Sequence, residues 1–269
     1  MSKVILLTGA TDGIGLLTAE KLIAEGHHVL IHGRNASKLQ AVEKKLFALA
    51  SGSVEAFQAD FSELSEVDAL AKQISEKHSH IDVIINNAGI YKTDQAISKD
   101  NLDIRFVVNT FAPYLLTKRL LALMDNTGRI INLSSAAQAP VDLDAMLGKY
   151  PIEETMNAYA QSKLAITMWS RQMALALADK GPAIIAVNPG SLLASKMVKE
   201  GFGVEGKDLN IGADILIQTS LSEAFSDASG LYFDNDIGEL SSPHPDGLDE
   251  KKCEALVMAM ERYLQFDSV

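Results

Sequence analysis

The stretch Val4-Ile-Leu-Leu-Thr-Gly-Ala-Thr-Asp-Gly-Ile-Gly15 decides the fold of this chain. It opens with an aliphatic run typical of strands that are buried on both faces of a parallel sheet. Gly9, Gly13 and Gly15 follow, spaced Gly-x-x-x-Gly-x-Gly, and lead into a helical pattern over 14–25. Glycine allows a tight turn and a close approach to a ligand, and a helix start offers free N–H groups to an anion. The stretch therefore predicts a phosphate-binding loop, with a glycine turn that binds nothing as the simpler alternative.

The rest of the chain repeats this alternation of strand and helix. Apolar runs predict strands at 4–7, 28–31, 54–57, 83–85, 129–133 and 183–187, with a last candidate at 230–233. Helical patterns occupy 14–25, 36–50, 63–79, 101–124, 155–179 and 208–222, with a last candidate at 249–266. Such alternation predicts an α/β fold, a doubly wound parallel sheet of about seven strands with helices on both faces. No repeat or linker interrupts it, so we expect residues 1–269 to form a single domain.

Composition excludes several classes of function. The net charge of −11 and the pI near 5.0 argue against nucleic acid as a partner, because phosphate contacts need clustered Lys and Arg. No apolar run approaches the roughly 20 residues of a membrane span, and the N-terminus lacks the pattern of a signal peptide. The single cysteine, Cys253, fits a reducing compartment. We therefore expect a cytoplasmic protein with no nucleic-acid or membrane partner.

The end of the second predicted strand, Ile31-His-Gly-Arg-Asn35, bears on cofactor choice. A dinucleotide site places an acid here for the ribose 2′-OH, or an arginine nearby for a 2′-phosphate. This chain has no acid at the strand end and carries Arg34 just beyond it, with Lys38 one turn further on. NADP(H) is therefore favoured and NAD(H) is the alternative, while a merely solvated Arg34 is the simpler interpretation.

Tyr159 and Lys163 lie four residues apart in Asn157-Ala-Tyr-Ala-Gln-Ser-Lys163. On a helix this spacing puts both side chains on one face. A nearby ammonium favours the phenolate, which makes the phenol a better acid or base near neutral pH. The pattern arises often by chance, so its weight depends on the glycine loop that precedes it.

Together these residues resemble the short-chain dehydrogenase/reductase family. Its motifs are matched in family order by Thr8–Gly15, Ala59-Asp60, Asn86-Asn-Ala-Gly89, Asn109, Ser134-Ser135, Tyr159-x-x-x-Lys163 and Asn188-Pro-Gly190. Within the family the chain is similar to the retinol-dehydrogenase-like and WW-domain-oxidoreductase-like group. That likeness lies in the wide gap between Ser135 and Tyr159 and in the segments 32–35 and 230–233. The resemblance implies a Rossmann-type fold and hydride transfer between a nicotinamide and a carbonyl or alcohol carbon.

The resemblance also implies roles for four residues. Tyr159 is expected to exchange a proton with the substrate oxygen, and Lys163 to lower the pKa of Tyr159 and hold the nicotinamide ribose. Ser135 is expected to orient the substrate oxygen, where negative charge develops. Asn109 is expected to anchor a water in a proton relay to Lys163. Ser134 is easily confused with Ser135, but adjacent strand side chains face opposite ways, so only one can point at the site.

Further residues are expected to contact the cofactor. They are Gly9, Thr11, Asp12, Gly13, Ile14 and Gly15 in the loop, then Arg34, Asn35, Asp60, Phe61, Asn87, Ala88, Gly89, Pro189, Gly190 and Leu192 at later strand ends, with Tyr159 and Lys163. Two features depart from the family pattern. Many NADP-preferring members have a basic residue where this chain has Asp12, so the NADP prediction depends on Arg34. The threonine that often follows Pro-Gly is absent in register, and Ser191 and Ser195 are both candidates for its contact to the carboxamide.

The segments 136–154 and 191–207 are predicted to line the substrate pocket, because both follow the carboxyl ends of strands. Both contain many apolar residues. A lipophilic aldehyde, ketone or alcohol would suit such a pocket, and packing of these residues on one another explains them equally well. Glycines at 201, 203 and 206 indicate a mobile lid.

Two other functions compete with the oxidoreductase prediction. A catalytically silent NADP-binding regulatory protein would have no need of all four catalytic residues, which are intact. A sugar epimerase or dehydratase of the same fold usually has a larger C-terminal region than remains after residue 190. The apolar helices at 101–124 and 155–179 predict a homodimer. No metal is expected, since His78 and His80 lie in a polar connection with only Asp82 nearby.

Overall fold

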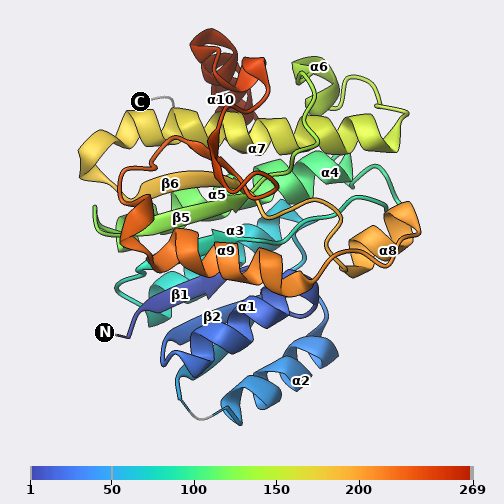
Figure 1. The fold of residues 1–269 in the computed structure, drawn as a ribbon. Helices are drawn as coiled ribbons and strands as arrows, with labels where there is room; N and C mark the ends of the chain where they lie inside the picture. Colours follow the sequence, from blue (N-terminus) through green and yellow to red (C-terminus); the bar gives the residue numbers. More distant parts are fainter. Residues whose placement is uncertain (1, 50, 267–269) are drawn as a thin grey trace.

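A central sheet of eight strands organises the molecule (Figure 1). The computed structural model describes residues 2–49 and 51–266, apart from the side chain of Phe202. The strands are β1 (Val4–Leu7), β2 (His28–Gly33), β3 (Ser53–Gln58), β4 (Val83–Asn86), β5 (Arg129–Leu133), β6 (Ala183–Asn188), β7 (Tyr232–Asp234) and β8 (Glu239–Ser241). They are ordered β3-β2-β1-β4-β5-β6-β7-β8, and every neighbouring pair is parallel except β7 and β8. The predicted α/β fold class is confirmed, and the short antiparallel β8 was not predicted.

The order of strands reverses direction between β1 and β4, which are neighbours in the sheet. The chain winds from β1 to β3 on one side and from β4 to β8 on the other. Leu7 at the end of β1 is in register with Ile85 of β4, so the segments that follow both strands leave the sheet side by side. Open α/β sheets bind ligands in the crevice at such a reversal. The glycine loop and Asn86–Gly89 therefore meet at one place.

Alternate side chains of each strand enter two separate cores. One core joins Leu6, Leu30 and Ile84 to one helical layer, and the other joins Ile5, Leu7 and Ile31 to the opposite layer. The first layer contains α3 (Leu64–Lys77), α5 (Ala112–Leu120), α7 (Thr155–Leu177) and α10 (Glu250–Leu264), and the second contains α1 (Gly13–Ala24), α2 (Ala36–Phe47) and α9 (Leu209–Leu221). Apolar side chains on both strand faces are what a doubly covered parallel sheet requires.

The segment predicted as one helix over 101–124 is interrupted. It consists of α4 (Ile104–Phe106), a π-helical turn over Val107–Phe111, α5, and a 3₁₀ turn over Leu121–Leu123. Pro113 has no N–H, so it cannot donate the usual i to i−4 bond to the carbonyl of Asn109. Widened π turns of this kind occur frequently at functional sites. Asn109 lies within this one.

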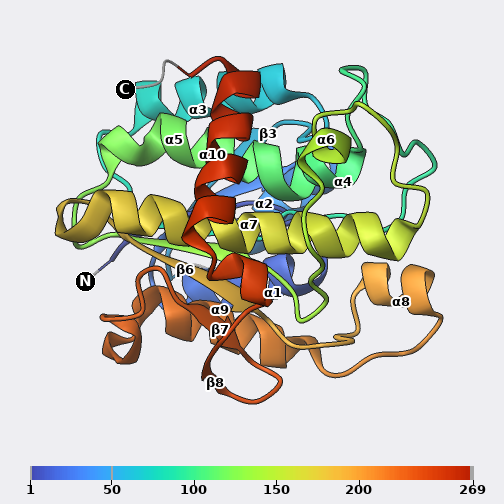
Figure 2. The ribbon, with the colours of Figure 1, turned by 90° about the horizontal axis from the view of Figure 1, so that it is seen from above.

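The C-terminal helix α10 crosses over α7 and α5 (Figure 2). Its Cys253, Leu256 and Met260 are buried in the core beneath it. Glu261 accepts hydrogen bonds from Tyr114 Oη at 2.7 Å and from Lys118 Nζ at 2.9 Å, both on α5. The helices predicted at 101–124 and 155–179 were expected to form a homodimer interface. Where α10 crosses them, it covers their outer face within the same chain. In the described part of the chain, no helix is both long and apolar enough to cross a membrane.

Candidate active site

The glycine loop lies against the end of β4 with no room for side chains. Asn87 Nδ2 donates to the carbonyl oxygens of Thr8 at 2.8 Å and Gly9 at 3.0 Å. A Cβ atom added at Gly9, whose φ is +66°, would lie 2.8 Å from Ala88 Cα. One added at Gly15 would lie 2.3 Å from the carbonyl oxygen of Gly9. The loop is therefore a bare backbone surface next to the start of α1, which fits a pyrophosphate.

Asp12 caps the N-terminus of α1, where its carboxylate accepts from Gly13 N at 2.7 Å. The side chain is exposed, so a fixed negative charge stands where a phosphate group would be attracted. Thr11 lies on the other side of the loop, and a Cβ added at Gly33 would meet its methyl group at 2.4 Å. The Ile14 side chain lies against Gly212 on α9, where an added Cβ would be 3.1 Å from Ile14 Cδ1. Among these three loop residues, Asp12 is the one whose negative charge would repel an anionic ligand.

His32 holds the loop in place from β2, a role that the sequence analysis missed. Its Nδ1 accepts from Gly9 N at 3.3 Å, and its Nε2 lies 2.9 Å from the carbonyl oxygen of Ala59. The ring stacks on Phe61 with 4.1 Å between centroids. Burial lowers the pKa of His32 to about 4, so the ring is neutral near pH 7, with Nδ1 as acceptor and Nε2–H as donor. A polar residue inside an apolar strand run was the only signal available.

Of the charged and polar residues at the neighbouring strand ends, Arg34 and Asn35 are exposed and Asp60 is half-buried. Asn35 caps α2 by accepting from Lys38 N at 2.9 Å. The Asp60 carboxylate accepts from Ser62 N at 2.9 Å and Ser62 Oγ at 2.8 Å. Arg34 is exposed, and its guanidinium forms no ion pair with any residue that the structure describes. An unpaired cation at this strand end is available to a 2′-phosphate.

Tyr159 and Lys163 project from α7 toward the ends of β4 and β5. The Ser135 hydroxyl lies close enough to Tyr159 to favour the phenolate, which acts to lower the pKa of the phenol. Lys163 Nζ lies 5.8 Å from the centroid of the Tyr159 ring and donates to the carbonyl of Leu133 at 2.7 Å. A Cβ added at Gly89 would lie 3.5 Å from Lys163 Nζ. The structure thus brings together residues from three segments that are far apart in the sequence.

Burial shifts the proton affinities of both groups. It lowers the pKa of Lys163 to about 8, because an ammonium is poorly solvated there. It raises the pKa of Tyr159, and the nearby Ser135 hydroxyl acts in the opposite direction. From the sequence, Lys163 was expected to lower the pKa of Tyr159. In the protein without cofactor, burial is the largest influence on this pKa and raises it.

The two adjacent serines face opposite ways. Ser134 is buried, donates to the carbonyl of Lys163 at 2.9 Å, and lies 2.7 Å from Thr167 Oγ1. Ser135 faces Tyr159, and its Oγ also accepts from Ala137 N at 3.1 Å. Ser134 is therefore part of the contact between β5 and α7, and Ser135 alone of the two is near the phenol.

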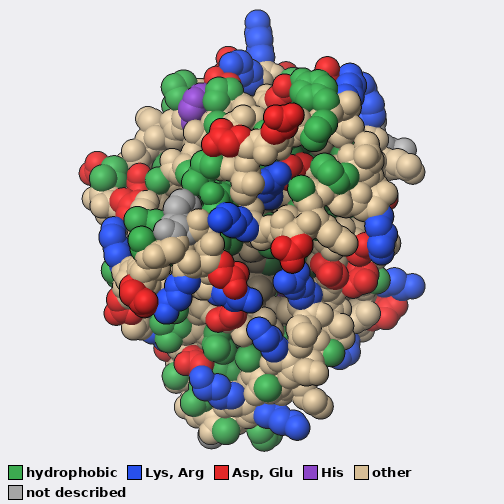
Figure 3. Space-filling model, turned by 90° about the vertical axis from the view of Figure 1, so that its right-hand side faces the viewer, with side chains coloured by type: hydrophobic (Ala, Val, Ile, Leu, Met, Phe, Trp, Pro, Cys, Tyr) green, Lys and Arg blue, Asp and Glu red, His purple; other side chains and the backbone are tan. Residues whose placement is uncertain are grey.

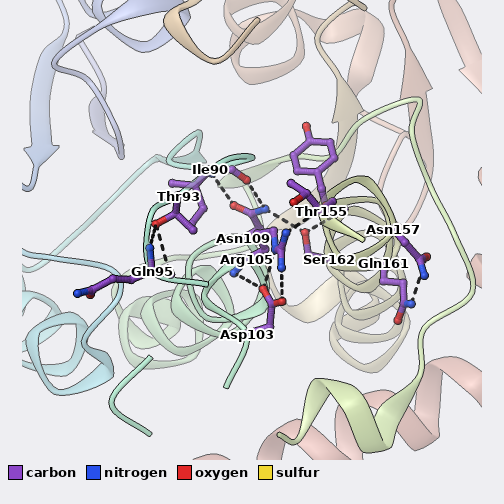
Figure 4. A network of polar contacts seen from close by, with 11 residues as sticks. Ile90, Thr93, Gln95, Asp103, Arg105, Asn109, Thr155, Asn157, Gln161 and Ser162 are labelled. Carbon is purple, nitrogen blue, oxygen red and sulfur yellow. Dashed lines mark hydrogen bonds and ion pairs between the residues drawn. The ribbon is translucent and has the colours of Figure 1, made fainter. Parts of the chain in front are cut away.

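Asn109 connects the segment after β4 to α7 (Figure 4). Its Nδ2 donates to the carbonyl of Ile90 at 3.0 Å and to Ser162 Oγ at 2.9 Å. Its Oδ1 accepts from Ile90 N at 2.8 Å. The side chain of Asn109 is thus occupied by these contacts, and Pro113, which has no N–H, cannot donate to its backbone carbonyl.

Tyr91 forms a wall beside the phenol and was also missed from the sequence. Its ring meets that of Tyr159 edge to face, with 5.3 Å between centroids. A Cβ added at Gly201 would lie 2.6 Å from the Tyr91 ring, so α8 (Lys196–Phe202) rests on it. Figure 3 shows that the face at the carboxyl ends of the strands is hollowed near its middle, with both basic and acidic side chains around the hollow.

The two serines that were candidates for the carboxamide contact are placed differently. Ser191 N donates to Asp236 at 2.9 Å, and its hydroxyl donates to the same carboxylate. Ser195 caps α8, and a Cβ added at Gly13 would lie 3.7 Å from Ser195 Cβ. Ser195 is therefore the one next to the phosphate loop. Leu192 between them is exposed and has a φ of +55°.

Two curated relatives are similar to almost the whole chain. Retinol dehydrogenase 13 of Homo sapiens is 29% identical over 268 residues, which cover 93% of this chain and 80% of the relative. WW domain-containing oxidoreductase of Homo sapiens is 26% identical over 284 residues, covering 98% of this chain and 68% of the relative. Both belong to the group that the sequence motifs indicated.

Solved structures share the fold. A protein from Mycobacterium paratuberculosis aligns with a TM-score of 0.80 at 23% identity, over 98% of this chain and 93% of that one. The RhlG/NADP complex of Pseudomonas aeruginosa aligns with a TM-score of 0.68 at 22% identity, over 86% and 94%. The model of the short chain dehydrogenase family matches residues 3–203. This chain therefore belongs to the short-chain dehydrogenase/reductase family and is similar to its retinol-dehydrogenase-like and WW-domain-oxidoreductase-like members.

Proposed function

We propose that the protein is an NADP(H)-dependent oxidoreductase that interconverts a lipophilic ketone or aldehyde with its alcohol. The observation that carries the proposal is the position of Lys163 Nζ, 5.8 Å from the centroid of the Tyr159 ring, with the Ser135 hydroxyl acting on the pKa of the same phenol. Two hydroxyl groups converge there, one to orient a substrate oxygen and one to exchange its proton. Membership of the family supports this chemistry.

The residues divide the proton chemistry among them. A bound nicotinamide supplies or accepts the hydride at the substrate carbon. During reduction the substrate oxygen gains charge, Ser135 donates a hydrogen bond to it, and the Tyr159 hydroxyl transfers its proton. Lys163 stabilises the phenolate that remains. The phenolate is then reprotonated by a relay that runs from solvent, through a water at the backbone carbonyl of Asn109, to Lys163 and on to Tyr159.

Arg34 supports the preference for NADP(H). An unpaired guanidinium at the end of β2 matches a 2′-phosphate, which it can bind with two parallel hydrogen bonds. The similarly folded RhlG holds NADP in its structure, which supports the same cofactor here. The cradle at Gly9 and Gly15 would hold the pyrophosphate, and Asp60 and Phe61 would flank the adenine.

The substrate would enter between 136–154 and 191–207 and meet Tyr91. The names of the relatives include a retinol dehydrogenase, whose named substrate is a lipophilic alcohol. An aromatic wall beside Tyr159 suits an apolar substrate that presents one oxygen to Ser135.

A substrate panel tests the proposal. Oxidation of NADPH and NADH by aldehydes, ketones and quinones is followed by absorbance for the wild type and for Tyr159→Phe. We expect turnover with NADPH in the wild type and its loss in the variant, with NADPH binding unchanged. Equal rates in the two proteins would refute the mechanism. Tight NADPH binding with no turnover on any substrate would favour the silent regulatory protein.

We also propose a cytoplasmic location and a homodimer. Because α10 covers part of the outer face of α5 and α7, a second chain would contact either the uncovered part of that face or α10 itself. Light scattering of the purified protein measures its mass directly. A mass of one chain at all concentrations would overturn the dimer.

A further inference from the structure

Three metal-ligand side chains meet at the amino end of the sheet, remote from Tyr159. His28 opens β2, Glu55 lies on β3, and His78 caps the end of α3. Glu55 Oε1 lies 3.0 Å from His28 Nε2 and 3.2 Å from His78 Nε2. All three ligand atoms lie within 4.8 Å of one another. The sequence paired His78 with His80, but His80 lies 3.5 Å from Asp82 instead.

The buried His78 Nε2 is aimed at the Glu55 carboxylate. It lies 3.2 Å from Glu55 Oε1 but makes no hydrogen bond of good geometry with any described residue. The neighbouring ring is already oriented, because His28 Nδ1 hydrogen-bonds to Ser53 Oγ. An outer contact of this kind directs the other nitrogen of a histidine toward a metal.

The separations match the coordination shell of zinc. Ligands at about 2.1 Å from a tetrahedral ion lie about 3.3 Å from one another. The separations of Glu55 Oε1 from the two imidazole nitrogens, 3.0 and 3.2 Å, are near this value, and the two nitrogens lie within 4.8 Å of each other. Two imidazoles with one carboxylate favour a transition metal over Mg²⁺ or Ca²⁺, which prefer oxygen ligands. The side chains are 24%, 32% and 14% exposed for His28, Glu55 and His78, so water can reach a fourth position.

One positive charge lies nearby. Lys77 Nζ is 3.6 Å from Oε2 of Glu55 and 5.1 Å from the centroid of the Phe57 ring. It approaches the other carboxylate oxygen, so Oε1 stays free between the two histidines. Its charge reduces the affinity for a cation without blocking the ligands.

We propose that His28, Glu55 and His78 form a Zn²⁺ site with three protein ligands and a fourth position open to water. A bound ion would tie β2, β3 and the connection after α3 together. The site lies at the opposite end of the strands from Ser135 and Lys163, since His28 is in register with the first residue of β1. Zinc is therefore expected to change stability and to leave turnover unchanged, which makes the site independent of the proposed function.

Zinc binding by the chelator-treated protein tests the site. We expect titration calorimetry to show one Zn²⁺ per chain, and saturating Zn²⁺ to raise Tm by about 5 °C, while Mg²⁺ does neither. His78→Gln and Glu55→Gln should lose both the binding and the shift. His80→Gln is the matched control, two residues away and outside the cluster, and should behave as the wild type.

Three results would overturn the proposal. The wild type could show no zinc-dependent shift, as expected of a hydrogen-bonded cluster alone. His78→Gln and Glu55→Gln could bind Zn²⁺ as the wild type does, or His80→Gln could lose binding equally. Circular dichroism of each variant without metal verifies that it is folded, and His28→Gln replaces either variant that is not.

Discussion

The two ends of the predicted cofactor cleft are built in different ways. At the catalytic end, Lys163 and Asn109 are 4% and 1% exposed, and their polar atoms bond to Leu133, Ile90 and Ser162. At the adenine end, the charged side chains of Asp12 and Arg34 are exposed. At the catalytic end, burial therefore shifts the pKa values of the side chains. At the adenine end, exposed charged side chains attract or repel the charged groups of the cofactor. Substitutions at the first should change stability and pH dependence, and those at the second should change cofactor affinity alone.

Lys163→Met should give the largest effect on stability. The buried ammonium has a pKa of about 8, below its ordinary value of 10.5, so the unfolded chain binds the proton more tightly. Burial of the ammonium therefore lowers the free energy of unfolding of the wild type. This effect is complete below pH 8 and vanishes as pH rises to 10.5. We expect the variant to be more stable by about 3 kcal/mol at pH 7, less the lost bond to Leu133.

Urea unfolding of the two proteins at pH 7 and pH 9.5 measures this difference. It should shrink at the higher pH, and the variant should lose turnover. A variant less stable than the wild type at pH 7 would show that the bond to Leu133 outweighs the burial of charge.

His32→Gln should have the next largest effect, because His32 lies between the two ends and is buried. The folded pKa of about 4 is below the ordinary 6.5, so its stabilising contribution is complete above pH 6.5 and is lost as pH falls toward 4. At pH 7 we expect a loss of about 2 kcal/mol from the bond to Ala59 and the stacking on Phe61. NADPH should also bind less tightly.

The control is His80→Gln, at an exposed histidine remote from the glycine loop. Denaturant unfolding from pH 7 to pH 4.5 should bring the His32 variant and the wild type closer together. A constant difference over that range would contradict the neutral His32 that the contacts require.

Arg34→Ala should change cofactor choice without changing stability. Loss of a charge-assisted contact to the 2′-phosphate should weaken NADPH binding by about tenfold and leave NADH binding unchanged. Fluorescence titration with both cofactors measures the ratio. Lys38→Ala, one helical turn away, should have a smaller effect. An equal loss of NADH affinity would show that Arg34 does not select the phosphate.

The parts of the site that depend on neighbours in sequence were predictable. The spacing of Tyr159 and Lys163 on one helix face, and the position of Gly9 after β1, follow from local periodicity. The parts that depend on contacts between distant segments were not. His32 acquires its role only because Gly9 and Ala59 lie beside it, and Tyr91 only because it meets Tyr159.

Irregular structure escaped prediction for a related reason. The pattern over 101–124 is apolar and helical throughout, so nothing in its period marks the π turn at Val107–Phe111. Pro113 was the available signal, since a proline inside a helix removes a hydrogen bond. The covering of α5 and α7 by α10 likewise depends on tertiary packing, and apolar helix faces alone indicated a second chain.

Asp12→Asn should have the smallest effect, and it separates the two kinds of charge at the adenine end. Asparagine is as good a helix cap as aspartate, so the bond to Gly13 N should remain while the negative charge is removed. Because the pyrophosphate is common to both cofactors, NADPH and NADH should both bind about threefold more tightly at low salt. The gain should fade at high salt, because the group is exposed. Asp249→Asn, which alters the cap of α10, is the control and should leave both affinities unchanged. A gain for NADPH alone would mean that Asp12 acts on the 2′-phosphate, and the division between Arg34 as selector and the loop as a common phosphate cradle would be wrong.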